Sequence, residues 1–131
     1  MIEVMLAKAR ARITRYAPDE VTDDVLLVDL RSNDERGRDG IIPGSVHVPR
    51  SVLEWRCDQD SGNANPVLAG RRLVLVCAHG ESSSLAAASL VRLGLRDAGD
   101  LEGGFEAWCE AGLPVAAAPT PVGMPGMGGP E

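Results

Sequence analysis

The 131-residue sequence is poor in aromatic side chains, in metal-binding cysteine patterns and in long apolar runs. Aromatic residues make up 3% of the chain, which argues against a base-stacking platform for single-stranded nucleic acid. No Cys-x-x-Cys pair occurs, and His47 and His79 complete no zinc-finger pattern. No run approaches the roughly 18 apolar residues of a membrane span, and residues 1–5 lack a basic segment followed by an apolar one. We therefore expect neither a span nor a signal peptide, and a cytoplasmic location.

Positive charge is also scarce. Nineteen acidic residues face thirteen basic ones, which gives a formal net charge of −6. An acidic surface repels phosphate backbones, so we expect no nucleic-acid partner, and no membrane partner either. The length suits one domain with its own core.

The cysteines are few, odd in number and far apart. Cys57, Cys77 and Cys109 can form at most one internal pair, so a disulfide scaffold is a poor interpretation. Free thiols in a reducing compartment are the better expectation.

Hydrophobic patterning predicts strands that alternate with helices. Residues 2–13 have the apolar spacing of an amphipathic helix, which we expect to pack on the domain rather than to form a dimer. Short apolar runs predict strands at 25–30, 45–48, 73–76 and 98–101. Helices are predicted at 85–93 and from 103–104 through Trp108, with an end at 112–114. The charged segment 34–39 and the polar segment 56–66 are expected to be loops. This alternation predicts an α/β fold with a mainly parallel sheet.

The strongest chemical signal is Cys77, which directly follows the predicted strand 73–76. Ligands in parallel α/β folds bind beyond the carboxyl ends of strands. A helix begins near Ser82 to Ser84, so unpaired backbone N–H groups face the loop, and Gly80 permits the turn that aims them inward. Such a loop favours a thiolate or a bound anion. The alternative is a buried cysteine that ends a strand, and the local sequence alone leaves both open.

Several further segments follow one another in an order that is specific in combination. They are residues 27–31, Ile-Pro-Gly within 41–49, the loop at Cys77, Gly-Gly-x-x-Ala-Trp within 101–108, and residues 111–115. Together, over roughly residues 12–115, they closely resemble a single-domain rhodanese. The resemblance implies a five-stranded, mainly parallel sheet flanked by helices on both faces. With the predicted N-terminal helix included, we expect a rhodanese-like domain at residues 1–115. The Pro- and Gly-rich composition of residues 116–131 predicts a flexible tail.

The resemblance also implies an activity. Cys77 would accept a sulfane sulfur as a persulfide and pass it on, with no metal and no organic cofactor. The donor would be a small-molecule or protein persulfide, and the acceptor a thiol or cyanide. The substrate-binding residues would be those of the loop: Ala78, His79, Gly80, Glu81, Ser82 and Ser83.

The loop departs from the family at one position. Active members usually carry arginine five residues after the cysteine, and Ser82 stands there. A serine attracts an anionic donor less than arginine does, and Glu81 would raise the pKa of Cys77 unless it points to solvent. Thiosulfate is therefore not necessarily the donor.

Two other functions compete with sulfur transfer. One is a rhodanese-like module without turnover, which binds a partner or senses oxidants through Cys77. The other is a cysteine phosphatase, which needs arginine six residues after the cysteine, where Ser83 stands, and an aspartic general acid that the sequence does not identify.

Other polar residues have plainer interpretations. We expect His79 to be exposed, Ser82 or Ser83 to cap the helix, and Asp29 with Arg31 to be architectural. Cys57 is expected to be an incidental loop thiol and Cys109 to lie far from the site. One or two loop arginines could supply the positive potential missing at Ser82; the candidates are Arg31, Arg36, Arg38, Arg50 and Arg56.

Overall fold

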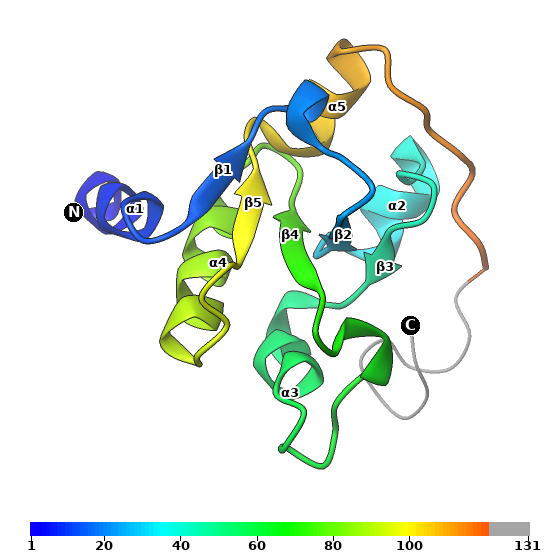
Figure 1. Ribbon diagram of the computed structural model, residues 1–131. Coiled ribbons are helices and arrows are strands. Elements are labelled where there is room, and N and C mark those ends of the chain that lie inside the picture. The colour runs from blue at the N-terminus through cyan, green and yellow to red at the C-terminus, as the bar shows by residue number, and fades with distance from the viewer. Residues whose placement is uncertain (121–131) are drawn as a thin grey trace.

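A computed structural model describes residues 1–120 and shows a single parallel sheet with five strands and five α-helices (Figure 1). The strand order is β1-β5-β4-β2-β3, and every strand pair is parallel. The strands are β1 (Thr14–Tyr16), β2 (Val25–Asp29), β3 (Val46–His47), β4 (Arg72–Val76) and β5 (Gly99–Leu101). The helices are α1 (Ile2–Arg10), α2 (Asn33–Asp39), α3 (Leu53–Cys57), α4 (Ser82–Arg92) and α5 (Gly104–Glu110). The predicted fold class is confirmed.

Strands β2 and β4 form the centre of the sheet, and Val25 pairs with Arg72 through to Asp29 with Val76. Side chains alternate between the faces, so each face carries its own core. One face, with Leu26 and Leu75, is covered by α3 and α4. The other, with Leu27 and Val74, packs against Phe105 and Trp108 of α5. Helices therefore cover both faces, as expected.

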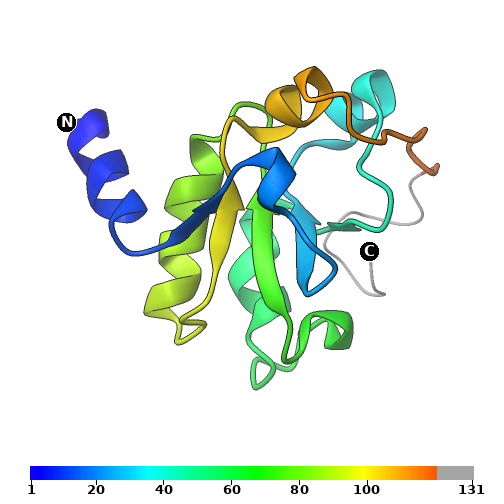
Figure 2. The same ribbon diagram turned by 45° about the horizontal axis from the view of Figure 1, so that its top comes forward.

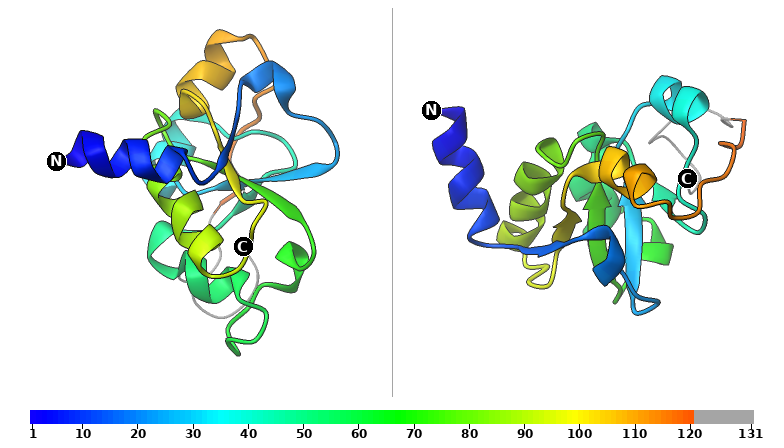
Figure 3. Two further views of the ribbon diagram at one scale, coloured as in Figure 1. Left: turned by 60° about the vertical axis from the view of Figure 1, so that its left-hand side comes forward. Right: turned by 90° about the horizontal axis from the view of Figure 1, so that it is seen from above.

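Helix α1 lies at the β1 edge of the sheet and contacts α4 (Figures 1 and 3). Only Ala9 of this helix is buried, while Ile2, Val4 and Met5 are about half exposed. The predicted packing on the domain is therefore made by the end of the helix nearest β1. Within residues 1–120, no helix has the length and apolar character needed to cross a membrane.

The prediction of a loop at residues 34–39 is wrong, because these residues belong to helix α2. Its residues include no apolar side chain that could show a helical period, so the helix depends on its cap. Ser32 accepts a hydrogen bond from the Glu35 amide, and Glu35 returns one to the Ser32 amide. Helix α2 lies beside α5, beyond the carboxyl ends of the strands (Figure 2).

Two other predictions need correction. The segment 56–66 is not wholly a loop, because Arg56 and Cys57 end α3 and are buried. The hydrophobic pattern also missed strand β1, which has only three residues. At the other end, Ala116 forms an antiparallel bridge with Ile41, and residues 121–131 of the expected tail lie outside the described part of the chain.

Candidate functional site

The site is built around residues 77–81, here called the Cys77 loop, which join β4 to α4. Cys77 directly follows the central strand, and its residue is only 7% exposed. Its Sγ accepts hydrogen bonds from the backbone N–H groups of Gly80, at 3.1 Å, and Ser83, at 3.3 Å. The Ser83 amide belongs to the first turn of α4, where N–H groups have no partner within the helix. The structure thus brings the predicted loop amides onto the sulfur.

The surroundings of the sulfur favour the thiolate. Burial raises the pKa of Cys77, but hydrogen bonds from the Ser82 and Ser83 hydroxyls and from the Ser83 and Gly80 amides outweigh it. The net result is a pKa below the usual value of a cysteine. Glu81 is exposed and is not among the groups that set this pKa, so its expected effect on the thiol is absent.

The carbonyl groups of the Cys77 loop are held by the neighbouring elements. The Cys77 carbonyl accepts from the Phe105 amide at 2.8 Å, and the Ala78 carbonyl accepts from the Glu106 amide at 3.1 Å. Both donors lie in the first turn of α5, so the unpaired amides of that helix are satisfied by the loop. This pairing fixes the loop against α5.

Glycine is required where the loop meets α5. A Cβ atom at Gly104 would lie 2.4 Å from the Cys77 carbonyl oxygen and 2.7 Å from the Gly80 nitrogen. A Cβ atom at Gly80 would lie 2.6 Å from the Gly103 nitrogen. Both residues also have positive φ angles, +65° and +82°. The Gly-Gly pair thus does more than turn the chain before α5, since it lets the backbone touch the loop.

Three residues that sequence reasoning missed support the loop from its other side. Asp100 of β5 is fully buried and accepts from the Ser83 and Ser84 hydroxyls at 2.8 and 2.7 Å. Arg15 of β1 pairs with Asp100 through Nε at 2.9 Å, and its Nη2 donates to the Gly80 carbonyl at 2.9 Å. Arg10 of α1 donates to the same carbonyl at 2.9 Å.

The serines do not cap α4 as expected. The N-cap residue is Glu81, and it makes no side-chain capping bond. Ser83 and Ser84 are completely buried and their hydroxyls face Asp100. The single Ser83 hydroxyl proton can go to Asp100 or to the Cys77 sulfur, but not to both at once. The Ser82 residue, in contrast, is exposed.

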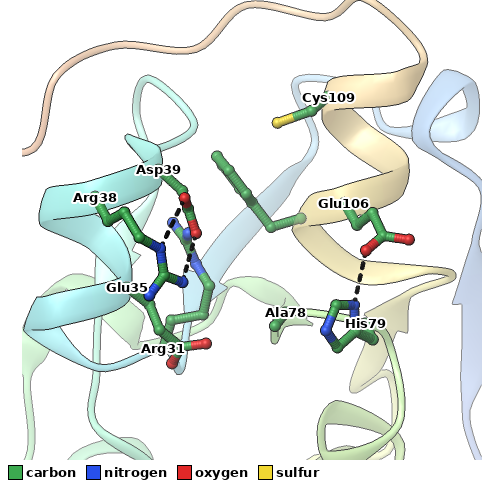
Figure 4. A pocket seen from close by; sticks show the side chains of 9 residues that line it. Arg31, Glu35, Arg38, Asp39, Ala78, His79, Glu106 and Cys109 are labelled. Carbon is green, nitrogen blue, oxygen red and sulfur yellow. Dashed lines mark hydrogen bonds and ion pairs between the residues drawn. The ribbon is translucent and has the colours of Figure 1, made fainter.

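A pocket of about 520 Å³ lies beside the loop, between α2 and α5 (Figure 4). Ala78 and His79 line its floor. The Arg38–Asp39 ion pair stands on one side, and on the other His79 Nδ1 lies 3.1 Å from Glu106 Oε2. Cys109 also points into this pocket, which Ala78 and His79 line but Cys77 does not. His79 is largely exposed, as expected.

Asp29 and Arg31 occupy the strand end next to Cys77. The Asp29 carboxylate binds Arg31 at 2.9 Å and Arg36 at 3.2 Å, and all three side chains are buried. Arg31 also stacks over the Phe105 ring, with 3.7 Å between the guanidinium carbon and the ring centroid. His47 is buried and its Nε2 lies 2.8 Å from the Arg31 carbonyl oxygen. The placement agrees with an architectural role.

The other two thiols differ sharply from Cys77. Cys57 is not an incidental loop thiol but a buried core residue, and burial together with the nearby Glu54 charge raises its pKa to about 12. Such a thiol is a poor nucleophile. Cys109 is exposed, and all three cysteines are free. Within the described residues, no group of three or more His, Cys, Asp or Glu side chains is placed to hold a metal ion.

The chain is similar to several known proteins. Residues 14–111 match the family model of the rhodanese-like domain. The chain is 33% identical over 96 residues to a sulfurtransferase of Allochromatium vinosum, which covers 73% of the chain and 82% of the relative. It is 37% identical over 84 residues to the thiosulfate sulfurtransferase GlpE of Pseudomonas savastanoi, which covers 63% and 71%.

A solved structure extends the comparison to the fold. A Rhodopseudomonas palustris protein, described as of unknown function and a possible tyrosine phosphatase, superimposes with a TM-score of 0.83. It is 35% identical, and the match covers 88% of this chain and 94% of the other.

Proposed function

Since the chain belongs to the rhodanese-like domain family, we propose that it is a sulfurtransferase that carries sulfur on Cys77. One observation carries the proposal: the Cys77 sulfur lies at a strand end with two backbone N–H groups aimed at it. These donors stabilise negative charge on the sulfur without a metal ion. The substrate-binding surface would be the backbone of Ala78, His79, Gly80, Glu81, Ser82 and Ser83.

The proposed reaction has two displacements. The Cys77 thiolate attacks the outer sulfur of a donor R–S–SH, so that the Cys77 S–S bond forms and the donor S–S bond breaks. The outer sulfur keeps its hydrogen, so Cys77 becomes the persulfide Cys–S–SH, and the donor leaves as the thiolate R–S⁻, which takes a proton from solvent. An acceptor thiolate or cyanide then attacks the outer sulfur of the Cys77 persulfide, and the Cys77 thiolate is released unchanged.

The charges around the pocket favour a donor less anionic than thiosulfate. Ser82 supplies no positive charge, and the Arg31 and Arg38 guanidiniums beside the pocket are already paired with Asp29 and Asp39. Of the five arginines considered as replacements for the missing positive charge, Arg36 and Arg56 are buried and Arg50 pairs with Glu54. A persulfide on a small thiol or on a protein fits this site better.

The test is sulfur loading measured by intact mass. Reduced protein is incubated with thiosulfate, mercaptopyruvate or a low-molecular-weight persulfide, and we expect a gain of one sulfur atom with at least one donor. Cys77→Ser is expected to abolish the gain, while the matched control Cys109→Ser keeps it. If no donor modifies folded wild-type protein, the chain is a rhodanese-like module without turnover, and the sulfurtransferase proposal fails.

A second prediction concerns donor choice. Ser82→Arg should raise the rate of loading from thiosulfate about 10- to 150-fold, because a charge-assisted hydrogen bond adds roughly 1.5–3 kcal/mol to anion binding. Ser82→Met is the control, since it removes the same hydroxyl without adding charge. The rates are followed by mass spectrometry with thiosulfate and with an uncharged persulfide. An equal rate in Ser82→Arg and Ser82→Met would contradict the electrostatic explanation.

A phosphatase function is less well supported. Phosphoryl transfer to a cysteine needs a bidentate arginine near the helix N-terminus. Ser83 stands at the position where that arginine is needed, and its hydroxyl faces Asp100.

A further inference from the structure

The Gly80 carbonyl receives two guanidinium groups from the N-terminal part of the chain. Arg10 Nη2 and Arg15 Nη2 each lie 2.9 Å from this oxygen. They come from different elements, α1 and β1, which lie next to each other at the β1 edge of the sheet (Figure 1). Two charged donors on one loop carbonyl make a stronger contact than ordinary loop hydrogen bonding.

Both arginines are themselves held in place. Arg15 forms a bidentate pair with the buried Asp100, at 2.9 and 3.3 Å. Arg10 Nε donates to the Ser84 hydroxyl at 3.1 Å, and that hydroxyl donates to Asp100 at 2.7 Å. The guanidiniums, the serine and the carboxylate thus form one connected network behind the Cys77 loop. Because buried polar networks are satisfied as a unit, the position of one member constrains the others.

The network acts on the loop through peptide geometry. The carbonyl and N–H groups of one trans peptide point in opposite directions. Holding the Gly80 carbonyl toward the arginines therefore turns the N–H of Glu81, in the same peptide, away from them. The two amides bonded to the sulfur flank this peptide in the chain: that of Gly80 comes directly before it, and that of Ser83 comes two peptides after it.

We propose that Arg10 and Arg15 are positioning residues that hold the Cys77 loop, through the Gly80 carbonyl, in the conformation that aims its amides at the sulfur. Neither arginine touches the sulfur itself in the contacts described. Arg10 also precedes residues 14–111, the segment that matches the rhodanese-like family model. Helix α1 is accordingly part of the site's support rather than an appendage to the domain.

The proposal deepens the proposed function but can be tested without a sulfur donor. The readout is the rate of Cys77 alkylation by iodoacetamide as a function of pH, in a Cys109→Ser background that leaves the buried Cys57 unreactive. Arg10→Ala is the first variant, because Arg10 is only partly buried and its loss leaves Asp100 paired with Arg15. Arg12→Ala is the matched control, since Arg12 is exposed on the same segment and carries the same charge.

We expect Arg10→Ala to move the midpoint of the curve of alkylation rate against pH to higher pH, because a displaced loop stabilises the thiolate less. At pH values below the wild-type midpoint, the variant should be alkylated about 3- to 10-fold more slowly than wild type. Arg12→Ala is expected to match wild type. Circular dichroism on heating shows whether each variant is folded. Equal profiles for Arg10→Ala and Arg12→Ala would overturn the role of Arg10.

Arg15 needs a second comparison, because its removal leaves Asp100 buried and unpaired. The double variant Arg15→Ala/Asp100→Asn removes both charges together. We expect it to fold while still alkylating more slowly than Asp100→Asn alone. Equal rates for these two variants would mean that Arg15 only neutralises Asp100, and would overturn its positioning role. Wild-type protein that takes up no sulfur, with these shifts intact, would refute sulfur transfer and leave the positioning role standing.

Discussion

Gly104→Ala is expected to reduce the free energy of unfolding by about 3–5 kcal/mol, a large share of the stability of a small domain. Two effects add. A side chain in the left-handed region costs about 1–2 kcal/mol, and the new Cβ would lie 2.4 Å from the Cys77 carbonyl oxygen. That oxygen belongs to backbone held by the Phe105 amide, so it cannot move aside without breaking the contact between the loop and α5.

The control for this substitution is Gly112→Ala. Gly112 also has a positive φ, +72°, but a Cβ there meets nothing within 4 Å. Gly112→Ala therefore has the unfavourable backbone conformation without the steric clash, and we expect it to lower the free energy of unfolding by only about 1–2 kcal/mol. Urea unfolding curves give both values. A loss at Gly104 no larger than that at Gly112 would mean that the loop and α5 are not in close contact.

Asp29→Ala should be similarly damaging, with an expected loss of about 3–5 kcal/mol, because removing one member of a buried ion network leaves charge without compensation. The Asp29 carboxylate is the shared partner of Arg31 and Arg36, whose side chains are 2% and 8% exposed. Removing the carboxylate would leave both buried guanidiniums without their shared counter-charge. We therefore expect the damage to extend to the wall of the pocket that Arg31 lines.

Asp39→Ala provides the comparison for Asp29. Asp39 also pairs with an arginine, Arg38 at 2.9 Å, but this pair is exposed. Exposed pairs contribute little to stability, so the midpoint of urea unfolding should barely change. Comparable losses in the two variants would contradict the assignment of the Asp29 network to the interior.

The Cys77 loop could be predicted from the sequence because its parts are local. A buried strand, a cysteine, a glycine three residues later and a helix start all lie within 72–92, and they place the amides on the sulfur. That the serines bind Asp100 instead of capping α4 could not be predicted from these local residues. Ser83 and Ser84 face Asp100, which is 16 or 17 residues away in sequence and identifiable only when β5 is placed beside β4.

The support from Arg10 and Arg15 was out of reach for the same reason. These residues meet Gly80 across 70 and 65 positions of chain, and nothing in residues 2–16 marks them as belonging to the site. Helix α2 is a different case. Its segment has no apolar side chain to show a period, yet the Ser32 and Glu35 pair was a readable capping signal.

The distances along the chain that separate the parts of the site also order its assembly. Loop closure over 65–70 residues is entropically costly, so such contacts form late when a chain folds. During synthesis, the donors from α5 follow Cys77 by nearly thirty positions, since Phe105 binds the Cys77 carbonyl. In an unfolded chain the Gly80 and Ser83 amides are not held on the sulfur, so Cys77 there has the ordinary acidity of a cysteine. The lowered pKa of Cys77 is therefore a property of the folded chain.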